Sequence, residues 1–361
     1  MITVFALKPF TGDPADGIDN VNIGIFGNVS EKKITYLVEV SEGFKGRGAI
    51  RRIDLGRSLT PRFLKKVSLI WRMCPDYLWG NGSLTELPFV LLKPRRTKYV
   101  IGWHTVLLKK SGAWKVRTPW FLRKLVFLCS DFIIAVSEFS AGTVRAFFPE
   151  KKIFVIVNGV DTGFFSPLKK NPHRLEEKYH IDFSKPVVSF VGTLQPRKRP
   201  DLIIDIAKEL PKANFVFVGN NTAPWHYDEE IKRLPNAQWV QAMPREDVAV
   251  LLASSSVFIF PSLRETCAAV IVEAMASGVP VITSRSGGNG EMIIDGESGF
   301  LIDPEIKNER EVFMEKLNLL LKDSSLQSTI SEAARRRAEN HFSWKNVAAR
   351  YESFLGDNSK F

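Results

Sequence analysis

Cysteine is scarce in this 361-residue chain. It has only three cysteines, Cys74, Cys129 and Cys267, which are widely spaced and form no CxxC pair. An odd number of scattered thiols predicts neither a disulfide framework nor a cysteine-ligated zinc site. Such a chain suits a reducing compartment, so we expect a cytoplasmic protein.

Long hydrophobic runs are also missing. The nearest candidate, TPWFLRKLVFLCSDFIIAVS at 118–137, is interrupted by Arg123, Lys124 and Asp131. A transmembrane helix needs about 20 consecutive apolar residues, so none is predicted. The N-terminal MITVFALKPFTGD has neither the basic start nor the apolar core of a signal peptide, and none is expected.

Two ligand-binding motifs have no match. The glycine-bearing segment FTGDPADGIDNVNIGIF at 10–26 could bring backbone amides, Gly17 among them, close to a phosphate. Its glycines do not follow the dinucleotide spacing GxGxxG, which argues against a nicotinamide enzyme. The chain also has no Asp-x-Asp pair, so we expect no required metal ion.

Positive charge is concentrated in the first half of the chain. The net charge is +11; residues 1–165 hold 25 Lys and Arg against 13 Asp and Glu, whereas residues 166–361 hold 25 against 26. The basic half would attract phospholipid headgroups, a phosphorylated acceptor or nucleic acid. A solvated basic surface without a specific partner is the alternative.

Short β-branched apolar runs alternate with helix-like segments in both halves. Their hydrophobicity is continuous rather than alternating, as in strands covered on both faces of a parallel sheet. We therefore expect an α/β fold with two lobes whose strand ends face one cleft, where ligands bind. The predicted strands are 2–7, 33–40, 75–80, 98–103, 131–137, 153–158, 186–192, 214–219, 237–241, 256–262, 279–284 and 299–303.

Two carboxylates stand out in RETCAAVIVEAMASG at 264–278, a loop that opens into a helix apolar on nearly every side. Glu265 follows a predicted strand and Glu273 lies along the helix, although an unpaired buried charge is costly. Together they could hold two sets of hydroxyls with an anion between them on the helix amides, as in a nucleotide sugar. Alternatively, Glu265 only favours the helix dipole and Glu273 pairs with a buried arginine.

Cations and a histidine follow two other predicted strands. SFVGTLQPRKRPDLII at 189–204 turns at Gly192 and places Arg197 and Lys198 just before a helix, where two fixed cations suit a diphosphate. Solvated loop charge is the alternative. His104, which follows the strand 98–103, either donates a hydrogen bond to a sugar or phosphate or is structural.

Taken together, these segments resemble the retaining glycosyltransferases of the GT-B type, in the large family (glycosyl transferases group 1) that includes sucrose synthases and many mannosyl- and glucosyltransferases. The similarity covers roughly residues 98–355 and is loose over the first ninety or so. It is carried by VSEFSAGTV (136–144), VIVNGVDTGFF (155–165), VGTLQPRKRP (191–200), VFIFPSLRETCAAVIVEAMASGVPVI (257–282), SGGNGEMIIDGESGFLID (286–303) and FSWKNVAARYESF (342–354).

The resemblance implies a role for each candidate residue. Glu265 would hold the transferred sugar and Glu273 the ribose, as the two acids of the family's glutamate–seven–glutamate motif. Arg197 and Lys198 would bind the diphosphate, and His104 would close over the donor sugar. The remaining donor-binding candidates are Gly192, Thr193, Thr266, Cys267, Ala268 and Gly17.

Three departures from the family pattern blur the identity of the donor. Thr266, Cys267 and Ala268 stand where many members have Gly-Phe-Gly. Relatives often have an arginine at Thr193, and the family's double glycine near the N-terminus appears only as Gly17.

The resemblance also implies the domain plan and the reaction. Two Rossmann-like lobes are expected, an acceptor-binding lobe at 1–165 and a donor-binding lobe at 166–340. A C-terminal helix at 341–361 is expected to pack back towards the first lobe. The expected reaction moves a hexose, of mannose or glucose type, from a UDP- or GDP-linked donor to a saccharide or lipid-linked acceptor. It retains the anomeric configuration and needs no cofactor.

Two basic, apolar segments bear on where the protein acts. TPRFLKKVSLIWRM at 60–73 and TPWFLRKLVFLC at 118–129 either place apolar and cationic residues at an anionic membrane surface or are ordinary core-packed helices. The first interpretation predicts peripheral association with the inner face of the cell membrane. The rival function is a non-catalytic nucleotide-sugar or nucleic-acid-binding protein. No specific nucleic acid is expected, because the aromatics show no stacking motif.

Overall fold

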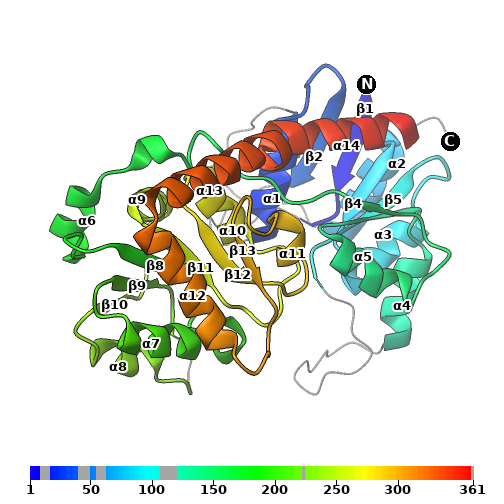
Figure 1. Cartoon of the computed structure of the whole chain (residues 1–361). Helices are drawn as coiled ribbons and strands as arrows, with labels where there is room; N and C mark the ends of the chain where they lie inside the picture. Colours follow the sequence, from blue (N-terminus) through cyan, green and yellow to red (C-terminus); the bar gives the residue numbers. More distant parts are fainter. Residues whose placement is uncertain (9–16, 40–48, 54–61, 106–119, 222–223, 359–361) are drawn as a thin grey trace. The chain divides into compact units, whose positions relative to one another are not determined.

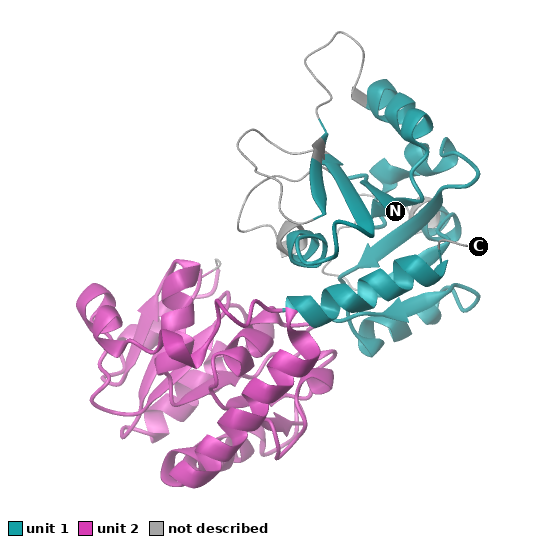
Figure 2. Ribbon diagram, turned by 90° about the horizontal axis from the view of Figure 1, so that it is seen from above, with its two compact units in different colours: residues 1–159, 344–361 teal, residues 160–343 magenta. Residues whose placement is uncertain are grey.

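The computed structural model describes residues 1–8, 17–39, 49–53, 62–105, 120–221 and 224–358. The chain forms two compact units: unit 1 is Met1–Gly159 with Trp344–Phe361, and unit 2 is Val160–Ser343 (Figure 2). We expected domain boundaries after residues 165 and 340. The boundaries between the two compact units follow residues 159 and 343. The C-terminal segment belongs to unit 1, where its helix contacts the first helix of the chain.

Unit 1 is built on a parallel sheet of seven strands in the order β3-β2-β1-β4-β5-β6-β7, of which β1, β2, β4 and β5 are labelled in Figure 1. Six of these strands coincide with predicted runs, and β3 was missed. Its sequence IRRI has two adjacent arginines between isoleucines, so it has no continuous apolar run, and β3 lies at the edge of the sheet. The strands are β1 (Ile2–Ala6), β2 (Ile34–Glu39), β3 (Ile50–Ile53), β4 (Tyr77–Gly80), β5 (Lys98–Trp103), β6 (Phe132–Ala135) and β7 (Ile153–Val155).

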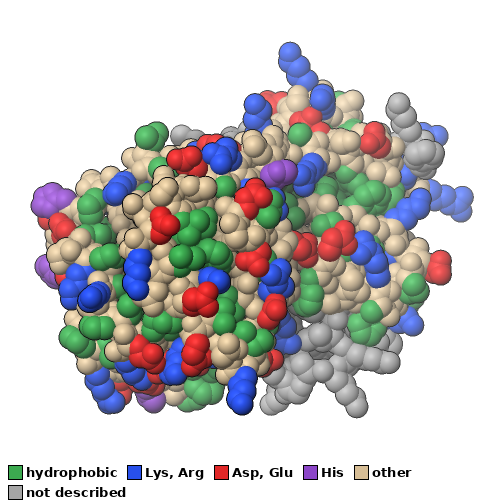
Figure 3. Space-filling model, in the orientation of Figure 1, with side chains coloured by type: hydrophobic (Ala, Val, Ile, Leu, Met, Phe, Trp, Pro, Cys, Tyr) green, Lys and Arg blue, Asp and Glu red, His purple; other side chains and the backbone are tan. Residues whose placement is uncertain are grey.

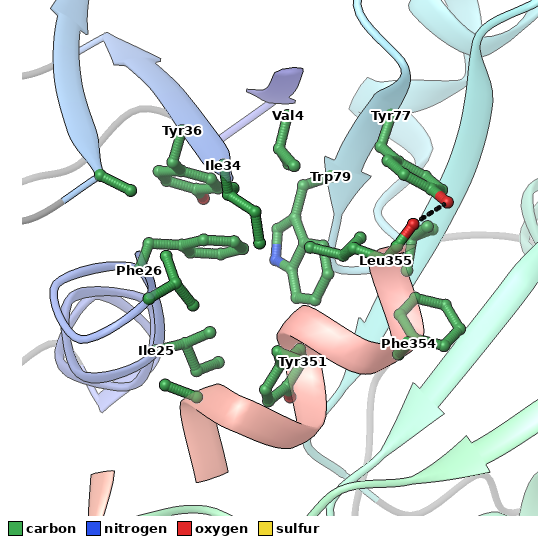
Figure 4. Close-up of a cluster of buried hydrophobic side chains, with 14 of the residues drawn as sticks. Val4, Ile25, Phe26, Ile34, Tyr36, Tyr77, Trp79, Tyr351, Phe354 and Leu355 are labelled. Carbon is green, nitrogen blue, oxygen red and sulfur yellow. Dashed lines mark hydrogen bonds between the residues drawn. The ribbon is translucent and has the colours of Figure 1, made fainter. Parts of the chain in front are cut away.

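Helices cover both faces of this sheet. The first and last helices bury Phe26 and Tyr351 against Trp79 on one face, where the Tyr77 hydroxyl donates to the Leu355 carbonyl at 2.9 Å (Figure 4). The other face has a separate core around Trp103 and Phe127. The helices are α1 (Gly17–Phe26), α2 (Arg62–Met73), α3 (Leu87–Leu91), α4 (Trp120–Leu128), α5 (Glu138–Arg145) and α14 (Trp344–Asn358).

Unit 2 repeats the plan with a parallel sheet of six strands in the order β10-β9-β8-β11-β12-β13. All six coincide with predicted runs: β8 (Val187–Val191), β9 (Asn214–Val218), β10 (Ala237–Val240), β11 (Val257–Phe260), β12 (Val281–Ser284) and β13 (Phe300–Ile302). Its helices are α6 (Pro172–Tyr179), α7 (Pro200–Glu209), α8 (Tyr227–Lys232), α9 (Arg245–Ser254), α10 (Ala269–Ala276), α11 (Asn289–Met292), α12 (Glu309–Lys322) and α13 (Ser324–Arg337).

The strand order of each sheet places its ligand-binding edge. In each sheet the strand that comes first in the chain lies in the interior of the sheet. The next two strands are added on one side of it, and the remaining strands on the other. The strand order therefore reverses between β1 and β4 in unit 1 and between β8 and β11 in unit 2. This is the Rossmann order, in which ligands bind outside the carboxyl ends of the strands at the reversal. The expected α/β fold with two Rossmann-like units is confirmed. Among the described residues, no helix is long and apolar enough to cross a membrane.

Candidate functional site

The candidate site of unit 2 is formed by the two loops that leave β8 and β11. The first carries Gly192–Lys198 into α7, and the second carries Pro261–Ala268 into α10. Backbone contacts hold the loops together: Leu263 N donates to the Arg197 carbonyl at 2.9 Å, and the Ser262 hydroxyl donates to the same carbonyl at 3.2 Å. The sequence-predicted cations and the first glutamate therefore lie side by side at the reversal point of the sheet.

Glu265 is the centre of this cluster. Its Oε1 accepts from Lys198 Nζ at 2.5 Å, from an Arg197 guanidinium nitrogen at 2.7 Å and from the Ser262 hydroxyl at 2.8 Å. The same guanidinium nitrogen donates to the Arg264 carbonyl at 2.6 Å. Three donors on one oxygen fix both cations in position before any ligand binds.

Lys198 lies in an apolar environment. Only 14% of its side chain is exposed, and Nζ lies 4.6 Å from the centre of the Phe260 ring. Burial lowers the Lys198 pKa, and the nearby Glu265 carboxylate counteracts this effect. Two cations and one carboxylate leave the cluster with one excess positive charge, which suits an anionic ligand such as a diphosphate.

Arg199, the third basic residue of this stretch, has a structural role. Its guanidinium pairs with Asp201 at 3.1 Å and with Glu309 at 2.9 Å. Its backbone is left-handed, with φ of 56°, where it precedes α7. Both of its ion pairs lie away from Glu265, so Arg199 braces α7 against α12.

The start of α10 lies directly after Glu265. The N-cap residue of this helix, Ala268, makes no side-chain cap bond to its first N–H groups. Cys267 is half-buried beside them. The loop after β12 braces the segment, since Gly288 N donates to the Glu265 carbonyl at 3.0 Å. Uncapped amides beside two fixed cations form an anion-binding arrangement.

Glu273 lies on α10 and makes a different contact. Its Oε1 lies 3.4 Å from an Arg245 guanidinium nitrogen, and burial raises the pKa of its carboxyl group. Arg245 in turn lies over the rings of Phe164 and Phe165, at 5.1 and 5.0 Å. Glu273 thus pairs with an arginine, as the alternative had it, but Arg245 is 53% exposed rather than buried. Among the described residues, the hydrogen bonds of Glu273 do not join the Glu265 cluster.

A close backbone approach shapes the turn at Gly192 and Thr193. Gly192 N donates to the Val218 carbonyl at 2.8 Å, and Gly219 crosses so near that a Cβ on it would overlap the Gly192 carbonyl. Gly219 also has φ of 142°, which favours glycine. The sequence prediction missed Gly219, although its position directly after an apolar run was a usable signal.

His104 and Gly17 belong to unit 1. His104 follows β5, and burial lowers its pKa from 6.5 to about 4, so its imidazole is neutral at physiological pH. Gly17 is the first residue of α1. The predicted phosphate-facing loop before it, residues 9–16, lies outside the described residues.

Unit 1 also contains a buried acid that the sequence prediction missed. Glu86 is 4% exposed, and its carboxylate accepts the backbone N–H groups of Asn81, Gly82 and Ser83. It also accepts the Tyr99 hydroxyl at 2.5 Å. Burial raises the Glu86 pKa. These bonds fix the loop after β4, at the reversal point of the first sheet.

Family comparisons agree with both units. The model described as Glycosyltransferase Family 4 matches residues 31–164, and the model described as Glycosyl transferases group 1 matches residues 173–337. The match in unit 2 contains Arg197, Lys198, Glu265 and Glu273.

Several curated proteins are similar over much of the chain. Spore coat protein SA of Bacillus subtilis (strain 168) is 31% identical over 60% of this chain and 62% of its own length. The sulfoquinovosyl transferase SQD2 of Arabidopsis thaliana is 25% identical over 82% of this chain and 58% of its own length. The capsular polysaccharide biosynthesis glycosyltransferase CapM of Staphylococcus aureus is 27% identical, over 82% and 81%. The chain thus spans about three fifths of the length of the first two.

Solved structures share the fold at low sequence identity. The sucrose-phosphate synthase from Thermosynechococcus elongatus matches with a TM-score of 0.75 and 16% identity over 99% of both chains. Anabaena HepE in complex with UDP-glucose matches with a TM-score of 0.72 and 20% identity, over 99% of this chain and 100% of that one. Together with the two family models, these similarities place the chain among the group 1 glycosyl transferases, with the GT-B fold.

Proposed function

We propose that this protein is a retaining, metal-independent glycosyltransferase. It moves a hexose, of mannose or glucose type, from a UDP- or GDP-linked donor to the hydroxyl of a saccharide or lipid-linked acceptor. The observation that carries the proposal is the Glu265 carboxylate, which Lys198 and Arg197 hold at the reversal point of the second sheet. Such a cluster offers both cations for a diphosphate and a carboxylate for sugar hydroxyls.

The charges of the cluster suit the leaving group. Negative charge grows on the nucleotide diphosphate as the glycosidic bond breaks and the sugar becomes oxocarbenium-like. Lys198, Arg197 and the uncapped amides at the start of α10 would stabilise that charge in a partly buried site. When a diphosphate takes over the two cations, Glu265 Oε1 becomes available to sugar hydroxyls.

Retention needs a further assumption. Retaining hydrolases use a carboxylate nucleophile paired with an acid. Here Glu265 would bind the sugar and Glu273 the ribose, so neither is free for that role. We therefore favour same-face displacement, in which the departing phosphate takes the proton of the acceptor hydroxyl.

Relatives support the donor and acceptor classes. HepE was solved with UDP-glucose. Another relative, 26% identical over 63% of this chain, is named as a GDP-mannose-dependent phosphatidylinositol monomannoside mannosyltransferase of Mycolicibacterium smegmatis. These names are consistent with a hexose donor and with a lipid-linked acceptor.

EDTA should leave turnover unchanged, because the two protein cations Arg197 and Lys198 would neutralise the diphosphate without a metal ion.

A binding protein without catalysis is the second candidate. The basic excess of the first half favours it, since that charge would attract nucleic acid without any reaction. Nucleic-acid binding by the first half of the chain does not explain the Glu265 cluster. Salt-sensitive RNA binding without nucleotide-sugar binding would support this candidate.

A thermal-shift screen of nucleotide sugars tests the proposal. A donor at a hundred times its dissociation constant stabilises the folded chain by about 2.7 kcal/mol, a clear rise in melting temperature. Glu273→Ala should lose this rise because the ribose loses its acceptor. The control Glu332→Ala, a surface residue of α13, should keep it. If no UDP or GDP sugar raises the melting temperature, the proposed function is wrong.

A further inference from the structure

Exposed apolar side chains gather on three helices of unit 1. Eight of the fifteen large apolar side chains that are exposed in the described chain lie there, so the clustering is not a general property of the surface. They are Phe63, Leu64, Trp71 and Met73 on α2, Leu91 and Leu92 at the end of α3, and Leu125 and Leu128 on α4.

The three helices form one continuous surface, here named the α2–α4 face. The Trp71 indole donates to the Leu92 carbonyl at 2.6 Å, which joins the end of α2 to the end of α3. The rings of Phe63 and Phe89 lie 5.1 Å apart at the other end of α2. Contacts between α3 and α4 complete the surface, and the three helices are labelled in Figure 1.

The exposed residues keep helical spacing while the opposite sides of the helices are buried. Leu64 and Trp71 are seven residues apart and Leu125 and Leu128 three, so each pair lies on one side of its helix. Ile70 and Phe127 on the inner sides are fully buried. The helices are therefore already packed in the core, while Leu64, Leu125 and Leu128 on their outer sides are exposed.

Basic residues predominate on this face, where Lys93 pairs with Asp131 at 3.7 Å. The segments 62–73, 87–96 and 120–128 contain four, three and two Lys or Arg residues and no Asp or Glu. Of these, Arg72, Arg95, Arg96 and Lys124 are exposed and make no ion pair within the described residues.

Unit 2 has a different surface. Its exposed Arg285 pairs with Asp295 at 2.9 Å and with Asp303 at 3.0 Å. Acidic and basic side chains are interspersed over the part of unit 2 seen in Figure 3. On the α2–α4 face, Arg72, Arg95, Arg96 and Lys124 have no acidic partner in the part of the chain that the structure describes, which favours an anionic partner from outside the chain.

We propose that the α2–α4 face docks on an anionic lipid bilayer. A tryptophan and leucines inserted at the headgroup level, surrounded by arginines and lysine, suit an apolar layer beneath a layer of phosphates. The bilayer would present the lipid-linked acceptor, and in this respect the inference rests on the proposed function. It adds α3 and the Arg95–Arg96 turn to the two segments singled out from the sequence.

Flotation of the full chain with lipid vesicles tests the docking. Wild type should float with phosphatidylcholine vesicles that contain phosphatidylglycerol, but not with phosphatidylcholine alone. Leu91→Ser/Leu92→Ser removes exposed apolar surface, and Arg95→Glu/Arg96→Glu reverses two charges. Each should weaken partitioning by more than about tenfold. The matched controls Trp225→Ser and Lys212→Glu change exposed residues of unit 2 and should bind like wild type.

The remaining outcomes are decisive. Absence of wild-type binding to anionic vesicles, or face variants that float like wild type, would overturn the docking. A wild-type dimer in sedimentation, dispersed by Leu91→Ser/Leu92→Ser without any vesicle binding, would instead assign the face to a second copy of the chain. The nucleotide-sugar thermal shift, measured on the same variants, reports separately on the proposed function and on folding.

Discussion

At the scale of single residues, Glu265 links sequence and chemistry most directly. A carboxylate held by Lys198 at 2.5 Å and Arg197 at 2.7 Å explains how a charge is tolerated in a side chain that is only 13% exposed. The pairing also holds Lys198 and Arg197 where a diphosphate is expected to bind. One cluster thus serves both the stability of unit 2 and the proposed chemistry.

Lys198→Ala should lower kcat by about 10²–10³ because one stabilising cation is lost where leaving-group charge develops. Steady-state kinetics with the donor found by thermal shift measure this. Lys208→Ala is the control, since Lys208 is exposed on α7 and pairs only with Asp205 nearby. A kcat within about threefold of wild type would remove Lys198 from the chemistry.

The lowered pKa of His104 predicts that the free energy of unfolding depends on pH. Its folded pKa of about 4 lies below the ordinary 6.5, so between these values the unfolded chain binds a proton that the folded chain does not. Its contribution is complete above about pH 6.5 and is lost as the pH falls towards 4, by at most about 3 kcal/mol. Urea unfolding at pH 7.5 and pH 5 should show a smaller loss in His104→Gln than in wild type.

Ser325→Ala is the control for this experiment. Ser325 is exposed and has no titratable side chain, so the substitution should leave the difference between the two pH values unchanged. An equal pH dependence in wild type and His104→Gln would show that His104 titrates normally.

At the scale of secondary-structure elements, the turn after β8 depends on its neighbour. The Gly192 carbonyl lies so close to Gly219 that no side chain fits between β8 and β9 at this level. Packing of two glycine backbones, rather than a motif within one loop, therefore positions Thr193 and the residues that lead to Lys198.

Gly219→Ala should destabilise unit 2 by about 3–5 kcal/mol, because strain at positive φ adds to the clash with backbone. Gly296→Ala is the comparison: its φ is 75°, but nothing lies within 4 Å of the new Cβ. It should cost only about 1–2 kcal/mol. Urea denaturation measures both values. Equal losses would mean that the close approach contributes nothing.

At the scale of the whole molecule, the chain returns to its first unit at its end. Val160 and Phe342, which lie near the two ends of unit 2, are adjacent, since Val160 N donates to the Phe342 carbonyl at 2.7 Å. Directly beyond, the Trp344 ring contacts Gly24 of α1 and Gly159 so closely that a Cβ on either glycine would overlap it. The last helix is therefore part of the core of unit 1, and not an appendage.

A matched pair of helical glycines tests this packing. Gly24→Ala should lose about 1–3 kcal/mol because its methyl group must displace Trp344. Gly356→Ala, in α14 with nothing within 4 Å, should gain about 0.5–1 kcal/mol from better helix propensity. Thermal unfolding compares the two. A gain in both variants would contradict the packing of Trp344 against α1.

Most of the strands could be predicted from the sequence alone. Continuous apolar runs predicted twelve of the thirteen strands that the structure describes, because strands buried on both faces need such runs. The missed strand, β3, lies at an edge, where Arg51 is exposed. Arg197, Lys198 and Glu265 were also predictable, since each follows the carboxyl end of a strand and such ends meet at one edge of a parallel sheet.

The ion-pair partners of the charged residues could be identified only from the tertiary structure. It paired Arg199 with Glu309 and Glu273 with the exposed Arg245, and both contacts join segments distant in sequence. It also revealed what surrounds Gly219 and Glu86: the Gly192 carbonyl beside Gly219, and the Tyr99 hydroxyl on the Glu86 carboxylate. Spacing along the chain predicts which end of a strand a side chain follows. Which charges meet there depends on packing between elements.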